Sequence, residues 1–194
     1  EQRYVEADLG ARRATLRDWA ESDTAMLAVC GGFQLFGHSY RPAEGAEMEG
    51  VGVFDAVTVA PPPGAVRYVG DVMGTADGTD GIAVVGFENH SGRTTLGSDA
   101  VAFARVSRGY GNNGQDGTEG AVYREAVGTY LHGPLLPKNP ALRDRLILAG
   151  LRHRYGSDIE VEFPQDPMAE RAHAGATAVA RSRGRKVGRV GPRS

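Results

Sequence analysis

The chain has 194 residues, with 28 glycines, 10 prolines, a single cysteine and a formal net charge of −2. The glycines follow no three-residue period, which excludes collagen, and one cysteine excludes an intrachain disulfide framework and any multi-cysteine metal site. No apolar run reaches the ~18–20 residues that span a bilayer, and no signal-peptide pattern opens the sequence. We therefore expect a cytoplasmic protein with no metal and no integral membrane segment.

Charge divides the chain into two parts. Residues 169–194 hold seven arginines and lysines against Glu170, so this tail carries +6 while residues 1–168 carry −8. The tail has few large apolar side chains, so burial there does not offset the entropy cost of ordering. We predict a folded domain over 1–168 and a basic tail that is largely disordered from about Gly175. Such a tail can touch nucleic acid or anionic lipid, but a solvated terminus is the simpler interpretation, and we expect no nucleic-acid partner.

Helical and extended patterns alternate along the domain. A broken helical pattern covers 3–20, and the apolar run 26–29 is typical of a buried strand that passes into a short helix. Asn139 and Pro140 predict the N-cap and first position of a helix that ends near Gly156. Further strands are predicted at 53–59, 66–73, 82–87, 101–106 and 121–131. The mixture predicts the α/β class.

Cys30 is a candidate nucleophile. It follows the apolar strand and precedes Gly31 and Gly32, which is the form of a nucleophile elbow. A sharp strand-to-helix turn presents the thiol, and the free N–H groups at the helix start stabilise a developing oxyanion. The alternative is a small buried side chain at a strand end, where most free cysteines lie.

A thiol nucleophile needs a base, and two histidines fit by pattern. His90 ends a predicted strand in a polar turn, and His132 ends another before Gly133 and Pro134. α/β enzymes place their chemistry at strand ends. Either histidine fits the base, and either also fits a turn residue that hydrogen-bonds the backbone.

Taken together, six segments resemble the class I (triad-type) glutamine amidotransferases. The similarity is closer to one branch, the glutaminase subunits of bacterial lipid II isoglutaminyl synthase, which look like the glutaminase domain of cobyric acid synthase. The segments that carry the resemblance are 30–34, 49–52, 67–71, 86–90, 109–114 and 128–139. The resemblance implies a flavodoxin-like three-layer sandwich.

The resemblance also implies roles for individual residues. Cys30 would attack the side-chain amide of glutamine, and His132 would serve as base and then as acid to the leaving ammonia. The backbone N–H of Gly31 would form part of the oxyanion hole, and the Arg67 guanidinium suits the carboxylate of an amino acid. The residues that would line the rest of the glutamine pocket are Gln34, Glu88, Asn89 and His90.

A partner is implied as well. Ammonia would pass to a MurT-like Mur ligase subunit, in a heterodimer, that uses ATP and Mg²⁺ to amidate the D-glutamate of lipid II to D-isoglutamine. The chain itself would hold no cofactor, and its lipid-linked substrate would bring it to the inner face of the membrane. The alternatives are the glutaminase component of a cobyric acid synthase-like corrinoid amidase, and an inert binding module that keeps the amidotransferase fold.

Two departures from the family pattern lead to expectations. Many triad amidotransferases have a Glu two residues after the catalytic His, but Pro134 occupies that position here, so we hypothesise that the ligase partner supplies the orienting acid. The family also has an N-terminal strand, a helix and a second strand leading to a Gly-rich loop with another oxyanion-hole donor. We expect the domain to lack these first strands and to show poor glutaminase activity alone.

Overall fold

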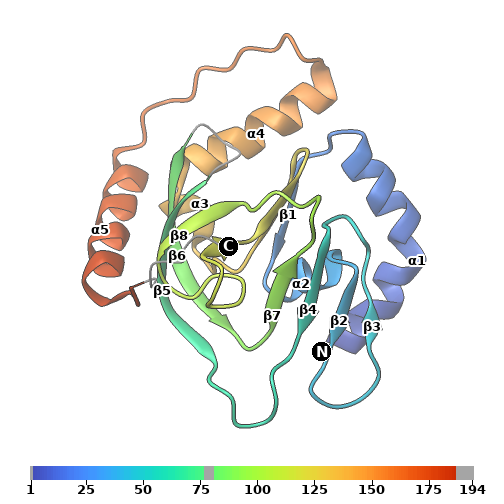
Figure 1. Ribbon diagram of the computed structural model, residues 1–194. Coiled ribbons are helices and arrows are strands. Elements are labelled where there is room, and N and C mark those ends of the chain that lie inside the picture. Colours follow the sequence, from blue (N-terminus) through green and yellow to red (C-terminus); the bar gives the residue numbers. More distant parts are fainter. Residues whose placement is uncertain (1, 77–80, 187–194) are drawn as a thin grey trace.

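The structure is a computed structural model that describes residues 2–76 and 81–186. Figure 1 shows the arrangement of its elements. In chain order they are α1 (Gln2–Glu21), β1 (Met26–Val29), α2 (Gly31–Phe36), β2 (Ser39–Arg41), β3 (Met48–Glu49), β4 (Ala56–Val59), β5 (Tyr68–Ala76), β6 (Ile82–His90), β7 (Arg93–Leu96), β8 (Ala104–Arg108), β9 (Thr118–Glu119), β10 (Ala121–Tyr123), β11 (Ala126–Thr129), α3 (Leu135–Lys138), α4 (Pro140–Tyr155) and α5 (Pro167–Arg183). Helices and strands are mixed along the chain, so the predicted α/β class is confirmed.

A small sheet at the centre of the fold joins the two halves of the hydrophobic core. Its strand order within the described residues is β1-β11-β10, with β1 parallel and β10 antiparallel to β11. Successive residues of β11 face opposite sides of the sheet, as the two-residue period of a strand requires. Ala126 packs into a core cluster with α1 and α2, and Val127 packs into a second cluster with β5, β8, α3 and α4.

Two further sheets flank this centre. One has the order β6-β5-β8-β9 and is antiparallel throughout, and the other has the order β3-β2-β4-β7. Helix α1 lies on one side of the molecule and α5 on the other, beside β5 (Figure 1). The predicted strand 121–131 is in fact two strands, β10 and β11, which turn at Arg124 with a positive φ of 51°.

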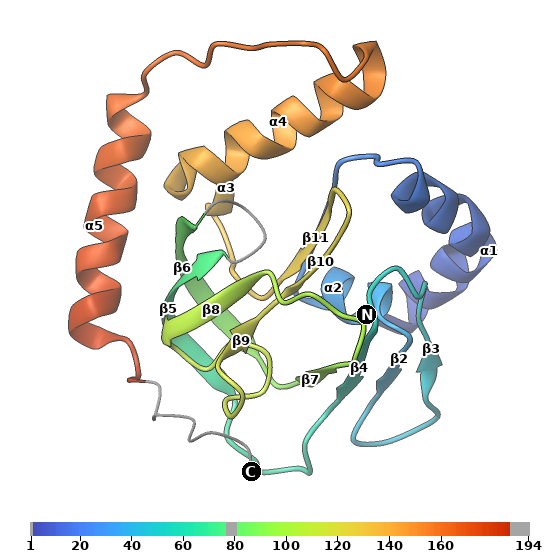
Figure 2. The same cartoon turned by 45° about the horizontal axis from the view of Figure 1, so that its top comes forward.

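The predicted disorder from about Gly175 is wrong for the described residues. Helix α5 runs to Arg183 and packs against β5, β6 and α3, at the end of a long connection from α4 (Figure 2). Asp166 caps it by accepting a hydrogen bond from the N–H of Ala169, and Ala180 is fully buried. Alanine favours helix and lets a helix approach a sheet closely, so large apolar side chains were not needed for docking. Residues 187–194 of the predicted tail lie outside the described residues.

Asn139 occupies the predicted N-cap position of α4, but its side chain holds a strand instead of the helix start. It precedes α4, which ends before Gly156 as predicted, but its side chain makes no capping bond. Instead its amide accepts a bond from Val85 N–H and donates to Val85 C=O, both at 2.8 Å, and also donates to the C=O of Leu135. This buried side chain therefore fixes β6 against α3 and the start of α4.

Candidate active site

Cys30 sits in a strained turn between β1 and α2. Its backbone has φ 52° and ψ −109°, and a non-glycine residue with positive φ costs about 1–3 kcal/mol. Its N–H donates to Thr129 C=O at 2.8 Å, so the turn is anchored to the end of β11. Burial raises the pKa of the thiol, while a hydrogen bond from the Gly31 backbone and the charge of Arg67 act to lower it. A thiol with a raised pKa needs a neighbouring base to become the nucleophile.

His132 and Cys30 follow strands that end at the same edge of the central sheet. Val29 lies opposite Thr129 in the parallel pair β1–β11, so the residues that follow both strands emerge at the same end. The His132 N–H donates to Phe87 C=O at 2.7 Å, which ties this segment to β6. Burial lowers the pKa of the imidazole, and the charges of His90 and Arg67 lower it further. A neutral imidazole of this kind can accept a proton.

A pocket of about 520 Å³ opens beside Cys30, a size suited to a small molecule. Its lining residues are Cys30, Gly31, Gln34, Tyr40, Arg67, Asn89, His90, Ser91 and Gly92. The structure thus gathers six of the eight candidates around one cavity, although their roles stay predictions. His132 and Glu88 do not line it. Sequence reasoning missed Tyr40, whose phenol pKa is raised by burial and by the nearby charge of Cys30.

Arg67 presents a fork at the pocket wall. Its Nε donates to Asn89 Oδ1 at 2.6 Å, Nη1 donates to Ser91 Oγ at 3.0 Å, and Nη2 donates to Asn89 C=O at 3.0 Å. A guanidinium has five N–H donors, so these bonds with the described residues leave one N–H on each terminal nitrogen. Two such donors match the two oxygens of a carboxylate.

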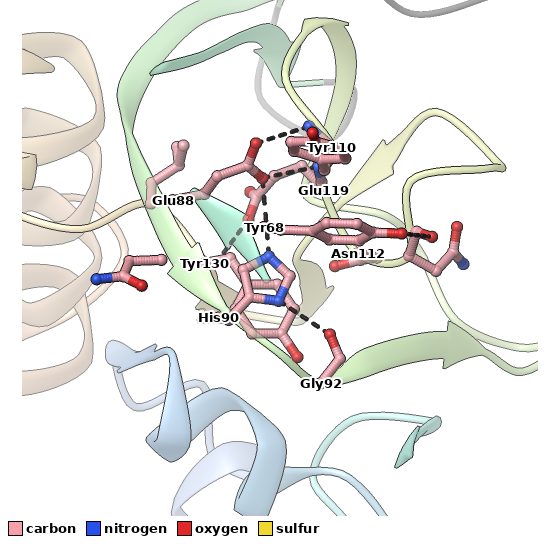
Figure 3. A network of polar contacts seen from close by, with 12 residues as sticks. Tyr68, Glu88, His90, Gly92, Tyr110, Asn112, Glu119 and Tyr130 are labelled. Atoms are coloured by element: carbon pink, nitrogen blue, oxygen red, sulfur yellow. Dashed lines mark hydrogen bonds and ion pairs between the residues drawn. The ribbon is translucent and has the colours of Figure 1, made fainter. Parts of the chain in front are cut away.

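The polar sequence 88–90 continues strand β6 rather than forming a turn. Because side chains alternate along a strand, Glu88 and His90 point inward and are buried, while Asn89 points outward to Arg67. Figure 3 shows the inward pair in its polar network. His90 Nδ1 donates to Gly92 C=O at 2.9 Å, and its ring stacks on Tyr130 with centroids 3.6 Å apart.

Glu88 is fully buried and lies behind the pocket wall. Its carboxylate accepts the backbone N–H groups of Tyr110 at 2.7 Å and Gly111 at 3.0 Å, and one oxygen lies 3.7 Å from His90 Nε2. The structure therefore places Glu88 where it fixes the loop 109–114 and His90, rather than where it would contact a substrate in the pocket.

Gln34 belongs to a chain of hydroxyl contacts behind the pocket. Its Nε2 donates to Tyr130 Oη at 3.1 Å, Tyr130 Oη lies 2.6 Å from Thr94 Oγ1, and Thr94 Oγ1 lies 2.8 Å from Thr58 Oγ1. Burial raises the pKa of Tyr130 to about 12, so its hydroxyl keeps its proton at neutral pH. This chain positions the first turn of α2 against the segment that leads to His132.

Glu119 is a second buried acid that sequence reasoning missed, because its flanking glycine and short strand resemble a turn. It accepts bonds from Tyr130 N–H at 2.6 Å and from the Thr129 hydroxyl. Burial raises the pKa of Glu119 to about 8, and the neighbouring charge of Glu88 also raises it. Glu119 thus holds the backbone just before His132.

The described residues show neither a metal-binding cluster nor a membrane-spanning helix. No group of three or more His, Cys, Asp or Glu side chains there is arranged to hold a metal ion. No helix in the same part of the chain combines the length and the apolar character needed to cross a membrane.

Comparison with known proteins places this geometry in a family context. A family model for the CobB/CobQ-like glutamine amidotransferase domain matches residues 3–140. The chain is 36% identical over 170 residues to the lipid II isoglutaminyl synthase (glutamine-hydrolyzing) subunit GatD of Streptococcus pneumoniae, covering 88% of this chain and 64% of that protein. It is 40% identical over 147 residues to the same subunit of Staphylococcus aureus, covering 76% and 58%. A probable cobyric acid synthase of Methanopyrus kandleri is 38% identical over 123 residues, covering 59% and 24%. The chain therefore spans roughly three-fifths of the length of the two GatD subunits.

Proposed function

The chain belongs to the CobB/CobQ-like glutamine amidotransferase family, and we propose that it hydrolyses the side-chain amide of glutamine at Cys30. One observation carries the proposal: a single pocket joins a strained cysteine to an arginine whose two terminal nitrogens each keep one N–H that no described residue accepts. Arg67 would bind the α-carboxylate of glutamine and so direct the side-chain amide toward Cys30 Sγ.

The proposed reaction forms and then breaks one thioester. His132 takes the thiol proton as Sγ attacks the amide carbon, and the oxygen that becomes negative accepts the N–H of Gly31. His132 then gives the proton to the departing nitrogen, which leaves as ammonia. Water, deprotonated by His132, attacks the thioester to release glutamate and return the Cys30 thiol. The lowered pKa of His132 suits the base, because it keeps the imidazole neutral at physiological pH.

We further propose that the ammonia serves a ligase partner that amidates lipid II. The names of the two GatD relatives support this assignment, since they describe a glutamine-hydrolysing subunit of lipid II isoglutaminyl synthase. The partner would bind ATP and Mg²⁺. His132 Nε2 has no hydrogen-bond partner among the described residues, and we propose that the acid that orients this imidazole comes from the ligase. Glutaminase rates of the chain alone and with the ligase test this point: full activity alone would exclude it.

The single cysteine allows a direct test of the glutamine site. A chloroketone analogue of glutamine should alkylate Cys30, and L-glutamine should protect it, whereas D-glutamine should protect poorly. Because Cys30 is the sole cysteine, the mass of the labelled chain reports this site alone, and Cys30→Ser is the blank. Labelling that L-glutamine does not slow would instead support the inert binding module.

A corrinoid amidase component is the second candidate, favoured by the similarity to cobyric acid synthase. The acceptor decides between the two. Mixed with the candidate ligase, ATP and glutamine, the chain should support amidation of a lipid II muropeptide precursor and not of a corrinoid acid.

A further inference from the structure

The segment that follows α5 returns to the body of the protein. The N–H of Gly109 donates to Arg185 C=O at 2.8 Å, and Arg108 forms an antiparallel bridge with Lys186. Gly184 makes this close approach feasible: a Cβ atom there would lie 2.5 Å from Ala180 O and 2.9 Å from the Cβ of Arg108. We call residues 184–186 the C-terminal strap.

The strap begins a column of alternating charged and aromatic groups. The Arg185 guanidinium lies 4.8 Å from the ring centroid of Tyr110, and Tyr110 stacks on Tyr68 with centroids 4.1 Å apart and planes 8° apart. The guanidinium of Arg93 lies 3.3 Å from the centroid of Tyr68. Two tyrosine rings are thus held between two arginines. Cation–π contacts and aromatic stacking both stabilise such a column.

The far end of this column is the wall of the glutamine pocket. Arg93 donates to Ser91 C=O and to Val66 C=O, each at 2.6 Å, and so clasps the two segments next to Arg67. Ser91 lines the pocket and accepts a bond from Arg67. The ring of Tyr68 also meets the buried pocket residue His90 edge-on, with centroids 5.6 Å apart.

We propose that the C-terminal strap positions the glutamine pocket through this column. Arg185 fixes Tyr110, Tyr110 fixes Tyr68, and Tyr68 with Arg93 holds Arg67 in the geometry that binds a carboxylate. The inference rests on the proposed function, because it assigns the column to that same site. Cys30 stands on the central sheet, and of the side chains in this argument only Arg67 acts on its thiol, through the charge that lowers the thiol pKa. Because a change in the strap leaves that charge in the chain, the strap acts more on glutamine affinity than on thiol reactivity.

The test measures affinity and reactivity separately in the full chain. Cys30 is alkylated with iodoacetamide at increasing L-glutamine, which gives a rate without glutamine and a concentration for half-protection. Arg185→Ala should raise that concentration about two- to five-fold, the range of one exposed cation–π contact, and change the unprotected rate by a smaller factor. Arg185→Lys, which keeps the cation, should recover part of the affinity.

Two further variants keep the outcome decisive. Arg181→Ala removes the same charge from an exposed position on α5 and should match the unsubstituted chain. Tyr110→Leu, which keeps apolar bulk without the ring, should weaken protection in the same direction as Arg185→Ala. The proposed role of the strap would be overturned if Arg185→Ala and the unsubstituted chain needed the same L-glutamine concentration for half-protection. It would also be overturned if Arg181→Ala raised that concentration as much as Arg185→Ala does. If glutamine protects none of the proteins, the unsubstituted chain included, the glutamine site itself is refuted.

Discussion

Replacing Glu119 with glutamine should change how the stability of the protein depends on pH. The folded-state pKa of Glu119 is raised to about 8 by burial, whereas an exposed Glu titrates near 4.5. Between these values the folded state binds a proton that the unfolded state has lost. The free energy of unfolding therefore falls as pH rises through this window, by about 1.4 kcal/mol per pH unit. From about pH 6 to pH 8 this one group should cost about 2 kcal/mol.

Glu119→Gln removes the titration and keeps the shape. In the structure the Tyr130 N–H and the Thr129 hydroxyl both donate to the Glu119 carboxylate. The neutral amide can still accept the Tyr130 N–H, and the Thr129 hydroxyl can rotate to accept from the amide NH2, as it can from a protonated carboxyl. Near pH 6 the variant and the unsubstituted chain should differ little, and by pH 8 the variant should be more stable by about 2 kcal/mol. Urea unfolding at a series of pH values measures the free energy of unfolding of both proteins. Subtracting one from the other at each pH removes the contributions of the groups that both proteins share.

The control for this experiment is Glu44→Gln, which neutralises an exposed carboxyl. Its free energy of unfolding should run parallel to that of the unsubstituted chain across the same pH range. The reasoning fails if Glu119→Gln also runs parallel, because Glu119 would then titrate alike in the folded and unfolded states.

Three other predictions follow from individual contacts. Asn139→Ala leaves three buried backbone groups of β6 and α3 without their partner, so urea unfolding should show a loss of about 3 kcal/mol; a loss below about 1 kcal/mol would contradict this account. Arg67→Gln removes a cation that lowers the pKa of both Cys30 and His132, so the rise of Cys30 alkylation with pH and the acid limb of kcat/KM should both move to higher pH; unmoved profiles would remove Arg67 from the site. Tyr40→Phe deletes a hydroxyl that lines the pocket, so KM for glutamine should rise several-fold with a smaller change in kcat; equal falls in kcat and kcat/KM would instead link Tyr40 to the chemical step.

Local sequence signals predicted the strand-to-helix turn at Cys30 and the main helix, α4. The turn at Cys30 was predicted from an apolar strand followed by two glycines, and α4 was predicted from its first proline and the glycine that follows it. Both signals lie within a few neighbouring residues, where the backbone preference of each residue type decides the structure. Arg67 and the choice of His132 over His90 came only from the family resemblance, because their meaning depends on contacts far along the chain.

The sequence features that failed were those decided by tertiary packing. Helix α5 carries small residues such as Ala180, which is fully buried. Such residues stabilise the docking of the helix because they let it approach β5 closely, and not because they bury large apolar side chains. Tyr40 lies on the three-residue strand β2, too short to show an alternating pattern. The local sequence around Glu119 is typical of a turn. Its hydrogen-bond donors, Thr129 and Tyr130, lie at the end of β11 and just after it, and only the structure shows them. In each case the deciding partner is distant in sequence, so no local pattern records it.

The architecture also separates the two tasks of the proposed reaction. Cys30 rests on the central sheet through its bond to Thr129, and the Arg67 fork rests on the turn at the end of β6, which the Arg93 clasp holds. The two parts meet at Tyr130, whose hydroxyl contacts Gln34 and whose ring stacks on His90. Residues that share a buried network are energetically coupled, whereas distant sites act independently. The effects of substitutions at Arg93 on the free energy of glutamine binding should therefore add to the effects of substitutions near Cys30. Changes at Tyr130, like those at Arg67, should alter glutamine affinity and thiol reactivity together.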